Sequence, residues 1–359
     1  MIATHRFPVP HLHAISRTLL MQAGTPHPIA DEVSAILIGA NLAGHDSHGV
    51  LRIPTYLQQI AEGKLDPAAE PKVVEEDATT LRIDGMNGFG HYTARRAMAL
   101  AIEKARTSKI SCVTFTRVQH IGRLGEYAED AARAGCLGIV TVGNGSRTVG
   151  RTSPHGGARA VLGTNPIAIG VPTGDDTPFV LDFATSIVAQ GKVQVAKSKG
   201  LDMPPGHLLD SDGYPTTKIE DFENGGSLVP FGGHKGYALS LFICLLGGLG
   251  TTFDPERAAM GGCYMQVLNI DAFTPLAAYQ QNVRTFLDAI KETPVAPDAA
   301  EVLVPGDFEQ RNRRERLAAG IEVPETIVGQ LQQWAARLQV PFDESTNEEQ
   351  DRARYATME

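Results

Sequence analysis

The densest cluster of residues able to do acid–base chemistry lies in the segment GHDSHGVLR at residues 44–52. His48 can exchange a proton with a substrate hydroxyl near neutral pH, because the ordinary pKa of a histidine is about 6.5. Arg52 offers a forked pair of donors that matches a carboxylate. Together these side chains suit a site for a hydroxy acid. Taken singly, His45 and Asp46 could instead cap a helix end, and His48 could be an ordinary loop residue.

A metal site is a second interpretation of the same segment. His45 and His48 could be two ligands of a zinc ion in a metal-dependent hydrolase, but such a site needs a third and a fourth donor. The sequence has no HExxH motif, and its four cysteines are too widely spaced to form a CxxC pair. Metal hydrolysis is therefore the minor alternative, and no metal is expected.

A second histidine stands at a predicted strand-to-helix corner. The apolar strand Cys112–Phe115 leads through Gln119, His120, Ile121 and Gly122 into a helix that Gly135 would end. Loops that follow a rigid strand are where α/β proteins display reactive side chains. His120 is therefore a candidate for acid–base chemistry.

Two further segments could hold a nucleotide. In FGGHKG at 231–236, glycines before a predicted helix let backbone N–H groups approach a phosphate, and Lys235 adds a positive charge; a simple tight turn is equally compatible. Asp182, at the end of an apolar strand, could bind a ribose hydroxyl or cap the next helix. The GxGxxG signature is absent, because Gly88–Thr93 and Gly143–Thr148 both lack its third glycine. An ordinary Rossmann domain is therefore not expected.

The predicted secondary structure that must position these residues differs between successive parts of the chain. Residues 10–63 have the apolar spacing of helices, and from residue 72 short β-branched runs alternate with helical stretches, which predicts an α/β unit. Expected strands include 80–83, 112–115, 139–142, 167–169 and 179–181, and expected helices include 92–106, 125–134 and 185–199. The apolar run 237–253 is too short for a membrane span and predicts a buried core helix that ends in glycines. After residue 273 the chain is helical and charged again, with a frayed tail expected from residue 344.

Composition limits the classes of partner. The chain has 359 residues, of which 42% are hydrophobic and 20% charged, and a formal net charge of −9. Nucleic-acid binding needs clustered Lys and Arg, so nucleic acid is not an expected partner. No cationic segment followed by an apolar core opens the sequence, and the cysteines suit free thiols. These features predict a cytoplasmic protein without membrane contact.

Six segments in sequence order resemble the malate/L-lactate dehydrogenase family of NAD(P)-dependent oxidoreductases, whose fold is unrelated to the Rossmann type. They are GHDSHGVLRIPTYL at 44–57, QHIGRLGEYAEDAARAG at 119–135, LGTNPIAIGVP at 162–172, FVLDFATS at 179–186, FGGHKGYALSL at 231–241 and LVPGDFEQRNRRER at 303–316. Within the family, the chain looks closest to the hydroxycarboxylate dehydrogenase branch.

This resemblance implies an α/β fold with two units: a non-Rossmann mixed-sheet cofactor domain over residues 76–279, and a helical domain formed from both chain ends, 1–75 with 280–359. It also implies a homodimer with the site in the cleft between the domains. The implied reaction moves a hydride between NAD or NADP and a small 2-hydroxy or 2-keto acid. Reduction of a cyclic imine or a diketo sugar acid is the alternative within this chemistry, and a catalytically silent binding protein is an alternative outside it.

By position, the resemblance also assigns roles to residues. His48 and His120 match the proton donor or acceptor of different members, and Ser47 and Arg52 match groups beside the substrate. We expect His120 to exchange the proton, His48 and Ser47 to hydrogen-bond the same oxygen, and Arg52 to bind the carboxylate. The positions that match cofactor-binding residues are Asn144, Asp182, Phe183, Ala184, His234, Lys235, Pro305, Gly306 and Asp307.

Overall fold

The computed structural model describes residues 3–148, 150–198 and 200–342, so the tail predicted from residue 344 lies outside the described residues. At its centre is a seven-stranded sheet with the strand order β2-β3-β4-β11-β5-β6-β7. Only β3 and β4 are parallel neighbours in this sheet, and the other five pairs are antiparallel. The predicted mixed sheet is thus confirmed. In spatial order its strands are β2 (Lys72–Glu76), β3 (Thr80–Gly88), β4 (Ile110–Val118), β11 (Met260–Asn269), β5 (Cys136–Gly145), β6 (Ile167–Val171) and β7 (Phe179–Phe183).

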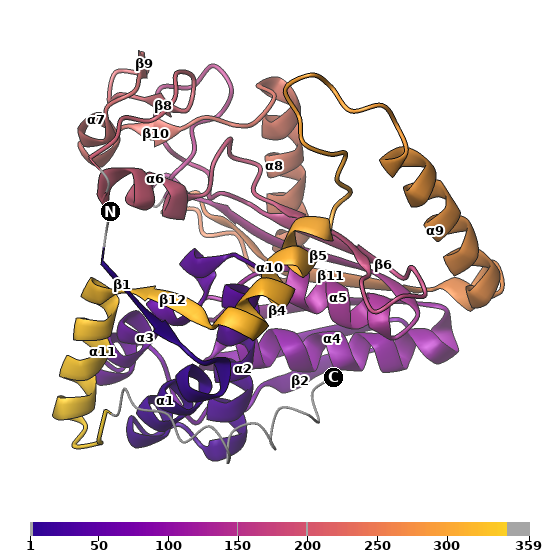
Figure 1. Ribbon diagram of the computed structural model, residues 1–359, viewed down its shortest axis with the longest axis horizontal. Helices are drawn as coiled ribbons and strands as arrows, with labels where there is room; N and C mark the ends of the chain where they lie inside the picture. Colours follow the sequence, from indigo (N-terminus) through magenta and orange to yellow (C-terminus); the bar gives the residue numbers. More distant parts are fainter. Residues whose placement is uncertain (1–2, 149, 199, 343–359) are drawn as a thin grey trace.

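Helices cover both faces of the sheet (Figure 1). From residue 94 onward the buried side of α4 (Gly90–Ser108) consists of four alanines and Met98, and these small residues let the helix pack closely on β4 and β11 beside α5 (Gly125–Arg133). On the opposite face, α8 (His234–Gly247) packs on β5 and β11. The α8 backbone approaches the sheet so closely that a Cβ at Gly143 would lie 2.5 Å from the carbonyl oxygen of Ile243. The chain continues from α8 into η3 (Gly248–Gly250), and η4 (Ile270–Ala272) and α9 (Leu276–Lys291) follow β11. A small unit contains α6 (Gln190–Ser198), β8 (Leu208–Leu209), β9 (Pro215–Thr216), α7 (Ile219–Glu223) and β10 (Ser227–Leu228).

The two ends of the chain form a joint helical layer, as predicted. Strand β1 pairs antiparallel with β12, with Phe7 opposite Ile321. One apolar core joins Leu12 and Leu37 from the first segment to Leu331 from the last. The domain boundaries at 76 and 280 stay a prediction. The layer contains β1 (Thr4–Phe7), α1 (Val9–Gln22), α2 (His27–Leu42), η1 (Asp46–His48), η2 (Val50–Arg52), α3 (Ile53–Ala61), α10 (Asp307–Ala319), β12 (Ile321–Pro324) and α11 (Glu325–Arg337).

Two predictions about helices were wrong in part. The helix expected over 185–199 begins only at Gln190, because Thr185 instead bonds to the carbonyl oxygen of Thr164 through both its N–H and its hydroxyl. The run from residue 237 does form a helix that ends at glycine, but it is buried on one face only. Phe242 and Leu245 on α8 are 55% and 60% exposed. No helix in the described ranges has the length and apolarity needed to cross a bilayer.

A glycine on β6 sets the distance between the sheet and α5. A Cβ on Gly170 would lie 2.0 Å from the backbone oxygen of Ala128, which cannot move without displacing the helix. We expect Gly170→Ala to lower the free energy of unfolding by about 1–3 kcal/mol in urea denaturation. Gly329→Ala on α11, where no atom lies within 4 Å of the added Cβ, is the control. It should be neutral or stabilising by up to about 1 kcal/mol, and equal losses in both variants would contradict the packing argument.

Candidate active site

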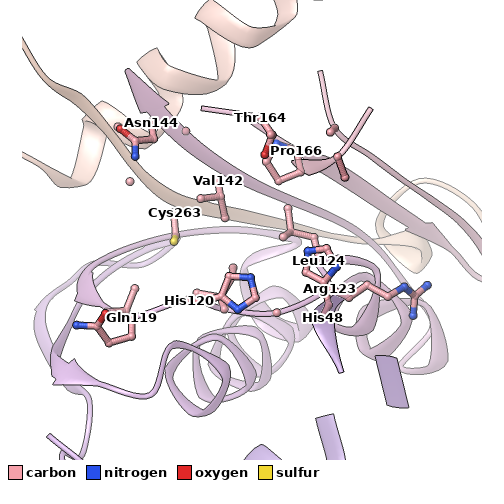
Figure 2. Close-up of a pocket in the computed structure, with 18 of the residues that line it drawn as sticks. His48, Gln119, His120, Arg123, Leu124, Val142, Asn144, Thr164, Pro166 and Cys263 are labelled. Atoms are coloured by element: carbon pink, nitrogen blue, oxygen red, sulfur yellow. The ribbon is translucent and has the colours of Figure 1, made fainter. Parts of the chain in front are cut away.

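A cavity of about 810 Å³ opens between the helical layer and the sheet (Figure 2). Its wall includes His48 from η1, His120 from the loop after β4, Asn144 from β5 and Phe183 from β7. Residues far apart in the sequence thus meet at one site. The volume lies within the range of about 300–1,000 Å³ that is usual for small-molecule sites, and it exceeds the need of a small acid alone.

The two candidate histidines lie together in this wall. The rings of His48 and His120 are stacked, with centroids 5.5 Å apart and planes inclined by 21°. Nδ1 of His120 is 2.8 Å from the hydroxyl of Tyr56, so its other nitrogen, Nε2, remains for a ligand. Nδ1 of His48 is 3.1 Å from the hydroxyl of Ser47. Both imidazoles are therefore held through one nitrogen each.

Desolvation makes both imidazoles neutral at physiological pH. Burial, followed by the charge of Arg52, lowers the pKa of His48 to about 4. His120 is exposed to the cavity, but the protein packed around the remaining sides of its ring still desolvates it. Burial, followed by the charges of His91 and Arg52, holds the pKa of His120 well below its ordinary value. A neutral imidazole can accept the proton of an alcohol, and an anion bound near Arg52 would raise the pKa of both histidines.

Arg52 provides the cation beside these rings. Its Nε–H donates a 2.7 Å hydrogen bond to the carbonyl oxygen of Ser47, which fixes the side chain against η1. Within the described part of the chain no carboxylate forms an ion pair with Arg52, so its charge is available to a ligand. Arg52 and Ser47 adjoin the cavity wall rather than line it.

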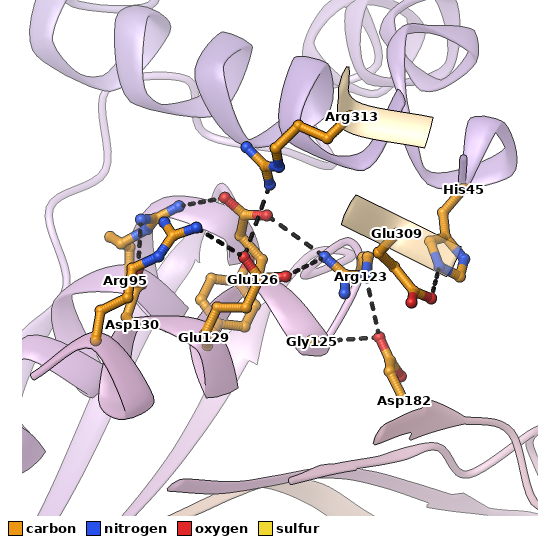
Figure 3. Close-up of polar contacts among 12 residues, drawn as sticks. His45, Arg95, Arg123, Gly125, Glu126, Glu129, Asp130, Asp182, Glu309 and Arg313 are labelled. Carbon is orange, nitrogen blue, oxygen red and sulfur yellow. Dashed lines mark hydrogen bonds and ion pairs between the residues drawn. The ribbon is translucent and has the colours of Figure 1, made fainter. Parts of the chain in front are cut away.

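A network of charged side chains holds the His120 loop in place (Figure 3). Arg123 is buried and donates to Glu129 at 3.0 Å, while Arg95 on α4 donates to Glu126 at 3.1 Å and to Asp130 at 3.0 Å. Burial raises the pKa of Asp130 to about 7. Because these contacts tie α4 and α5 to the loop, they limit the movement of His120.

Comparison with known proteins identifies the family. Residues 7–332 match the family described as malate/L-lactate dehydrogenase. The chain belongs to this family. Hydroxycarboxylate dehydrogenase B of Escherichia coli (strain K12) is 38% identical over 336 residues, which covers 89% of this chain and 91% of the relative. Malate dehydrogenase of Pyrococcus abyssi is 35% identical over 350 residues, with 93% and 95% covered.

Solved structures show the same fold. Malate dehydrogenase from Entamoeba histolytica superposes with a TM-score of 0.88 at 26% identity, covering 95% of this chain and 99% of that one. Delta1-piperideine-2-carboxylate reductase from Pseudomonas syringae has a TM-score of 0.79 at 31% identity, with 92% and 100% covered. As a malate/L-lactate dehydrogenase family member, the protein is an oxidoreductase of 2-hydroxy acids that uses NAD or NADP.

The cavity wall suits a nicotinamide ring. Val142, Pro166 and Phe183 offer apolar surface, and Asn144 and Thr164 offer polar groups that a carboxamide can bond. Figure 2 shows Asn144, Thr164 and Pro166 on the side of the cavity opposite His120. Four predicted cofactor residues line this cavity: Asn144, Asp182, Phe183 and Ala184.

Asp182 has a structural role in addition to its place in the wall. Its carboxylate accepts a 2.7 Å hydrogen bond from the backbone N–H of Gly125 and lies 3.7 Å from Nε of Arg123 (Figure 3). It therefore caps the start of α5, whereas the sequence suggested a cap on the helix after β7. Burial raises the pKa of Asp182, and the charge of Arg123 opposes this rise.

The other predicted cofactor residues do not line the cavity that contains His48 and His120. His234 and Lys235 begin α8, and the ring centroids of His234 and His155 are 6.0 Å apart. Pro305 and Asp307 line a second cavity of about 380 Å³, and Gly306 precedes α10. Asp307 is bonded there to Lys291 at 2.8 Å. Strand β7 connects the cavities, because Phe179 lines the second and Phe183 the first. The roles of these residues in cofactor binding stay predictions.

His45 and His48, the two candidate metal ligands, do not belong to a metal-binding cluster in the part of the chain that the structure describes. Nε2 of His45 is 3.0 Å from Glu309, and the described residues contain no group of three or more histidine, cysteine or acidic side chains arranged to bind a metal ion. The structure thus gives no support to the metal-hydrolase alternative.

Sequence reasoning missed Tyr56 and His91. Tyr56 falls in the region 10–63, whose apolar spacing predicts helices, and His91 falls in the segment 88–93, which lacks the third glycine of GxGxxG. Both are buried, and the hydroxyl of Tyr56 lies between the two histidines His91 and His120. The available signal was that a buried tyrosine hydroxyl requires a partner.

The buried imidazole of His91 should make stability depend on pH. Burial, followed by the charges of His48 and Arg52, lowers the pKa of His91 to about 3. In the unfolded chain its pKa is about 6.5, so between these pH values the unfolded state binds more protons and stability falls as pH falls. This residue should account for a loss of about 2–3 kcal/mol between pH 7 and pH 4.5. Urea denaturation at both pH values should show that the free energy of unfolding falls by that much less in His91→Gln than in the wild type. An unchanged loss would contradict the assigned neutral state.

Proposed function

We propose that the protein transfers a hydride between nicotinamide and a small 2-hydroxy or 2-keto acid, with Arg52 binding the carboxylate and His120 exchanging a proton with the C2 oxygen. The observation that supports this assignment is the contact of two neutral imidazoles, 5.5 Å apart, beside a cation without an acidic partner among the described residues. A carboxylate at Arg52 would direct the adjoining carbon toward these rings.

The residues of the chain orient the substrate and exchange a proton with its C2 oxygen, and a bound nicotinamide would supply or accept the hydride at C2. In oxidation, Nε2 of neutral His120 takes the hydroxyl proton as the C2 hydrogen leaves as hydride. In reduction, protonated His120 gives that proton to the C2 oxygen. His48, held by Ser47 and stacked on His120, would hydrogen-bond the same oxygen.

The identity of the acid is a matter for direct assay. Relatives are named malate, L-lactate and L-sulfolactate dehydrogenases, which supports a short 2-hydroxy acid as substrate. The structural likeness to a delta1-piperideine-2-carboxylate reductase favours a cyclic imine as the second candidate, and a diketo sugar acid is a third. Initial rates at the absorbance band of reduced nicotinamide, with NADH and NADPH against a panel of keto acids, diketo sugar acids and cyclic imines, separate these candidates. A rate on none of them would refute the proposal.

The site would lie between two domains with boundaries near residues 76 and 280. His48 comes from the helical layer, and Asn144 and Phe183 come from the sheet. A substrate held between them would couple binding to the relative position of the two units.

The exposed face of α8 supports a homodimer. Phe242, Leu245 and Leu249 are each more than half exposed on α8 and η3, and an apolar patch of this kind usually marks a protein contact. The molar mass in solution tests this assembly. The four cysteines are unpaired, which suits work in the reducing cytoplasm.

A further inference from the structure

Three side chains form a hydrogen-bonded series from the cavity wall into the core. The Tyr56 hydroxyl lies 2.8 Å from Nδ1 of His120 and 3.4 Å from Nε2 of His91. The three residues come from α3, from the first turn of α4 and from the loop after β4. Tyr56 is 2% exposed and His91 is fully buried. No solvent is therefore needed to connect His120 to His91.

His91 is tightly enclosed. Its ring meets that of Tyr56 edge to face, with centroids 5.4 Å apart, and a Cβ at Gly122 would lie 2.8 Å from its Cδ2. Gly122 has φ +76°, a conformation that favours glycine. Nδ1 of His91 is buried without a hydrogen-bond partner in the described part of the chain. An apolar side chain would fill this place without an unpaired polar atom, so the feature that distinguishes His91 is the contact of its Nε2 with Tyr56.

The Tyr56 hydroxyl can donate one hydrogen bond and accept others. Burial raises the pKa of Tyr56 far above its ordinary value, so the hydroxyl keeps its proton. When His120 is neutral and unprotonated at Nδ1, the hydroxyl donates to that nitrogen. When His120 is cationic, Nδ1–H donates to the hydroxyl oxygen, and the hydroxyl proton must turn to another acceptor. Nε2 of His91 is the acceptor within reach.

We infer that Tyr56 and His91 are positioning residues for the proton exchange at His120: they direct Nε2 toward the cavity and give Nδ1 a partner in both charge states of the ring. This inference rests on the proposed acid–base role of His120. Neither residue touches the C2 oxygen, so both act through His120.

The inference predicts an unequal effect on the two directions of the reaction. The groups that face His120 are Tyr56 on α3, His91 on α4, His48 on η1 and Arg52 on η2. Arg52 is charged at pH 7 and disfavours the cation, whereas His48 and His91 are neutral at that pH and would disfavour it only if they were protonated. The hydroxyl, with His91 as its acceptor, is therefore the group that supports the cation. Reduction uses cationic His120 as the proton donor, whereas oxidation uses the neutral ring. Loss of the hydroxyl should therefore slow reduction more than oxidation at pH 7.

The test is the pH dependence of kcat in both directions for the wild type, Tyr56→Phe, His91→Leu and His91→Gln. In Tyr56→Phe we expect kcat for reduction at pH 7 to fall about 10- to 100-fold, as for loss of a hydrogen bond to a charged group. In this variant the rate of reduction should begin to fall at a lower pH than in the wild type. KM should change less than kcat. His91→Leu should shift the profile in the same direction, and His91→Gln should recover most of that loss because its amide oxygen can accept from Tyr56.

The outcomes separate this inference from the proposed function. A wild-type enzyme that shows no nicotinamide-dependent turnover would overturn both. A wild-type enzyme that turns over, with an unshifted pH profile in Tyr56→Phe or with identical profiles in His91→Leu and His91→Gln, would overturn the inference alone. Because Tyr56→Phe removes one oxygen atom and the two His91 variants are compared with each other, loss of folding in one variant leaves the other comparison decisive.

Discussion

Replacing His120 with alanine should lower kcat for both oxidation and reduction by about 10²- to 10⁴-fold, the usual contribution of a positioned acid–base group. The reason is geometric, since the ring lies in the cavity wall with Nδ1 bonded to Tyr56 and Nε2 left for the substrate. Cofactor affinity should change little, because the predicted nicotinamide surface is formed by residues of the opposite wall. Steady-state kinetics and cofactor titration measure both effects.

Two further variants make this result specific. His48→Ala should lower kcat less than His120→Ala does if His48 only hydrogen-bonds the C2 oxygen. His27→Ala, an exposed histidine at the start of α2, should leave kcat unchanged. A larger loss in His48→Ala would transfer the acid–base role to His48, and full activity in both His120→Ala and His48→Ala would refute the assignment of either histidine.

Replacing Arg52 with glutamine should raise KM for the acid and lower kcat/KM by about 30- to 1,000-fold. This is the kinetic equivalent of about 2–4 kcal/mol for loss of a partly buried, charge-assisted contact to a carboxylate. Arg52→Lys should recover part of the loss, since lysine keeps the charge but lacks the forked donors. The pKa of His48 and His120 should rise in Arg52→Gln, because the charge of Arg52 lowers both.

The Arg52 variants need a test of folding, because Nε of Arg52 also bonds to Ser47. The free energy of unfolding should fall less in Arg52→Lys than in Arg52→Gln, and the apparent Kd for the cofactor should be unaffected in both. An unchanged KM for the acid in a folded Arg52→Gln enzyme would show that another group binds the carboxylate.

The sequence pattern predicts the secondary structure around His120 correctly. The segment Cys112–Phe115 lies in β4, which ends at Val118, and α5 begins at Gly125, so His120 falls at the expected corner. The apolar run 237–253 predicts a buried core helix, yet Phe242 is 55% exposed. A sequence does not distinguish a face covered by its own chain from one left for another molecule.

The site was predictable only for residues whose types suggest chemistry. His48 and His120 were named from the sequence, and their stacking depends on the packing of η1 against the loop after β4. The contact of Tyr56 with His91 cannot be predicted from local spacing, because 35 residues separate the two and only the fold brings α3 and α4 together. The absence of Lys235 from the wall of this cavity could not be predicted either, since local spacing does not define the path of the chain between distant segments.

The most direct test of the central claim follows the hydrogen at C2. The enzyme should oxidise a 2-hydroxy acid deuterated at C2 and yield reduced nicotinamide that carries the deuterium, in ordinary water and without exchange. Mass spectrometry of the nicotinamide would show one deuterium for each keto acid formed. Reduced nicotinamide that contains only hydrogen from the solvent, or no reduced nicotinamide at all, would contradict direct hydride transfer in this cavity.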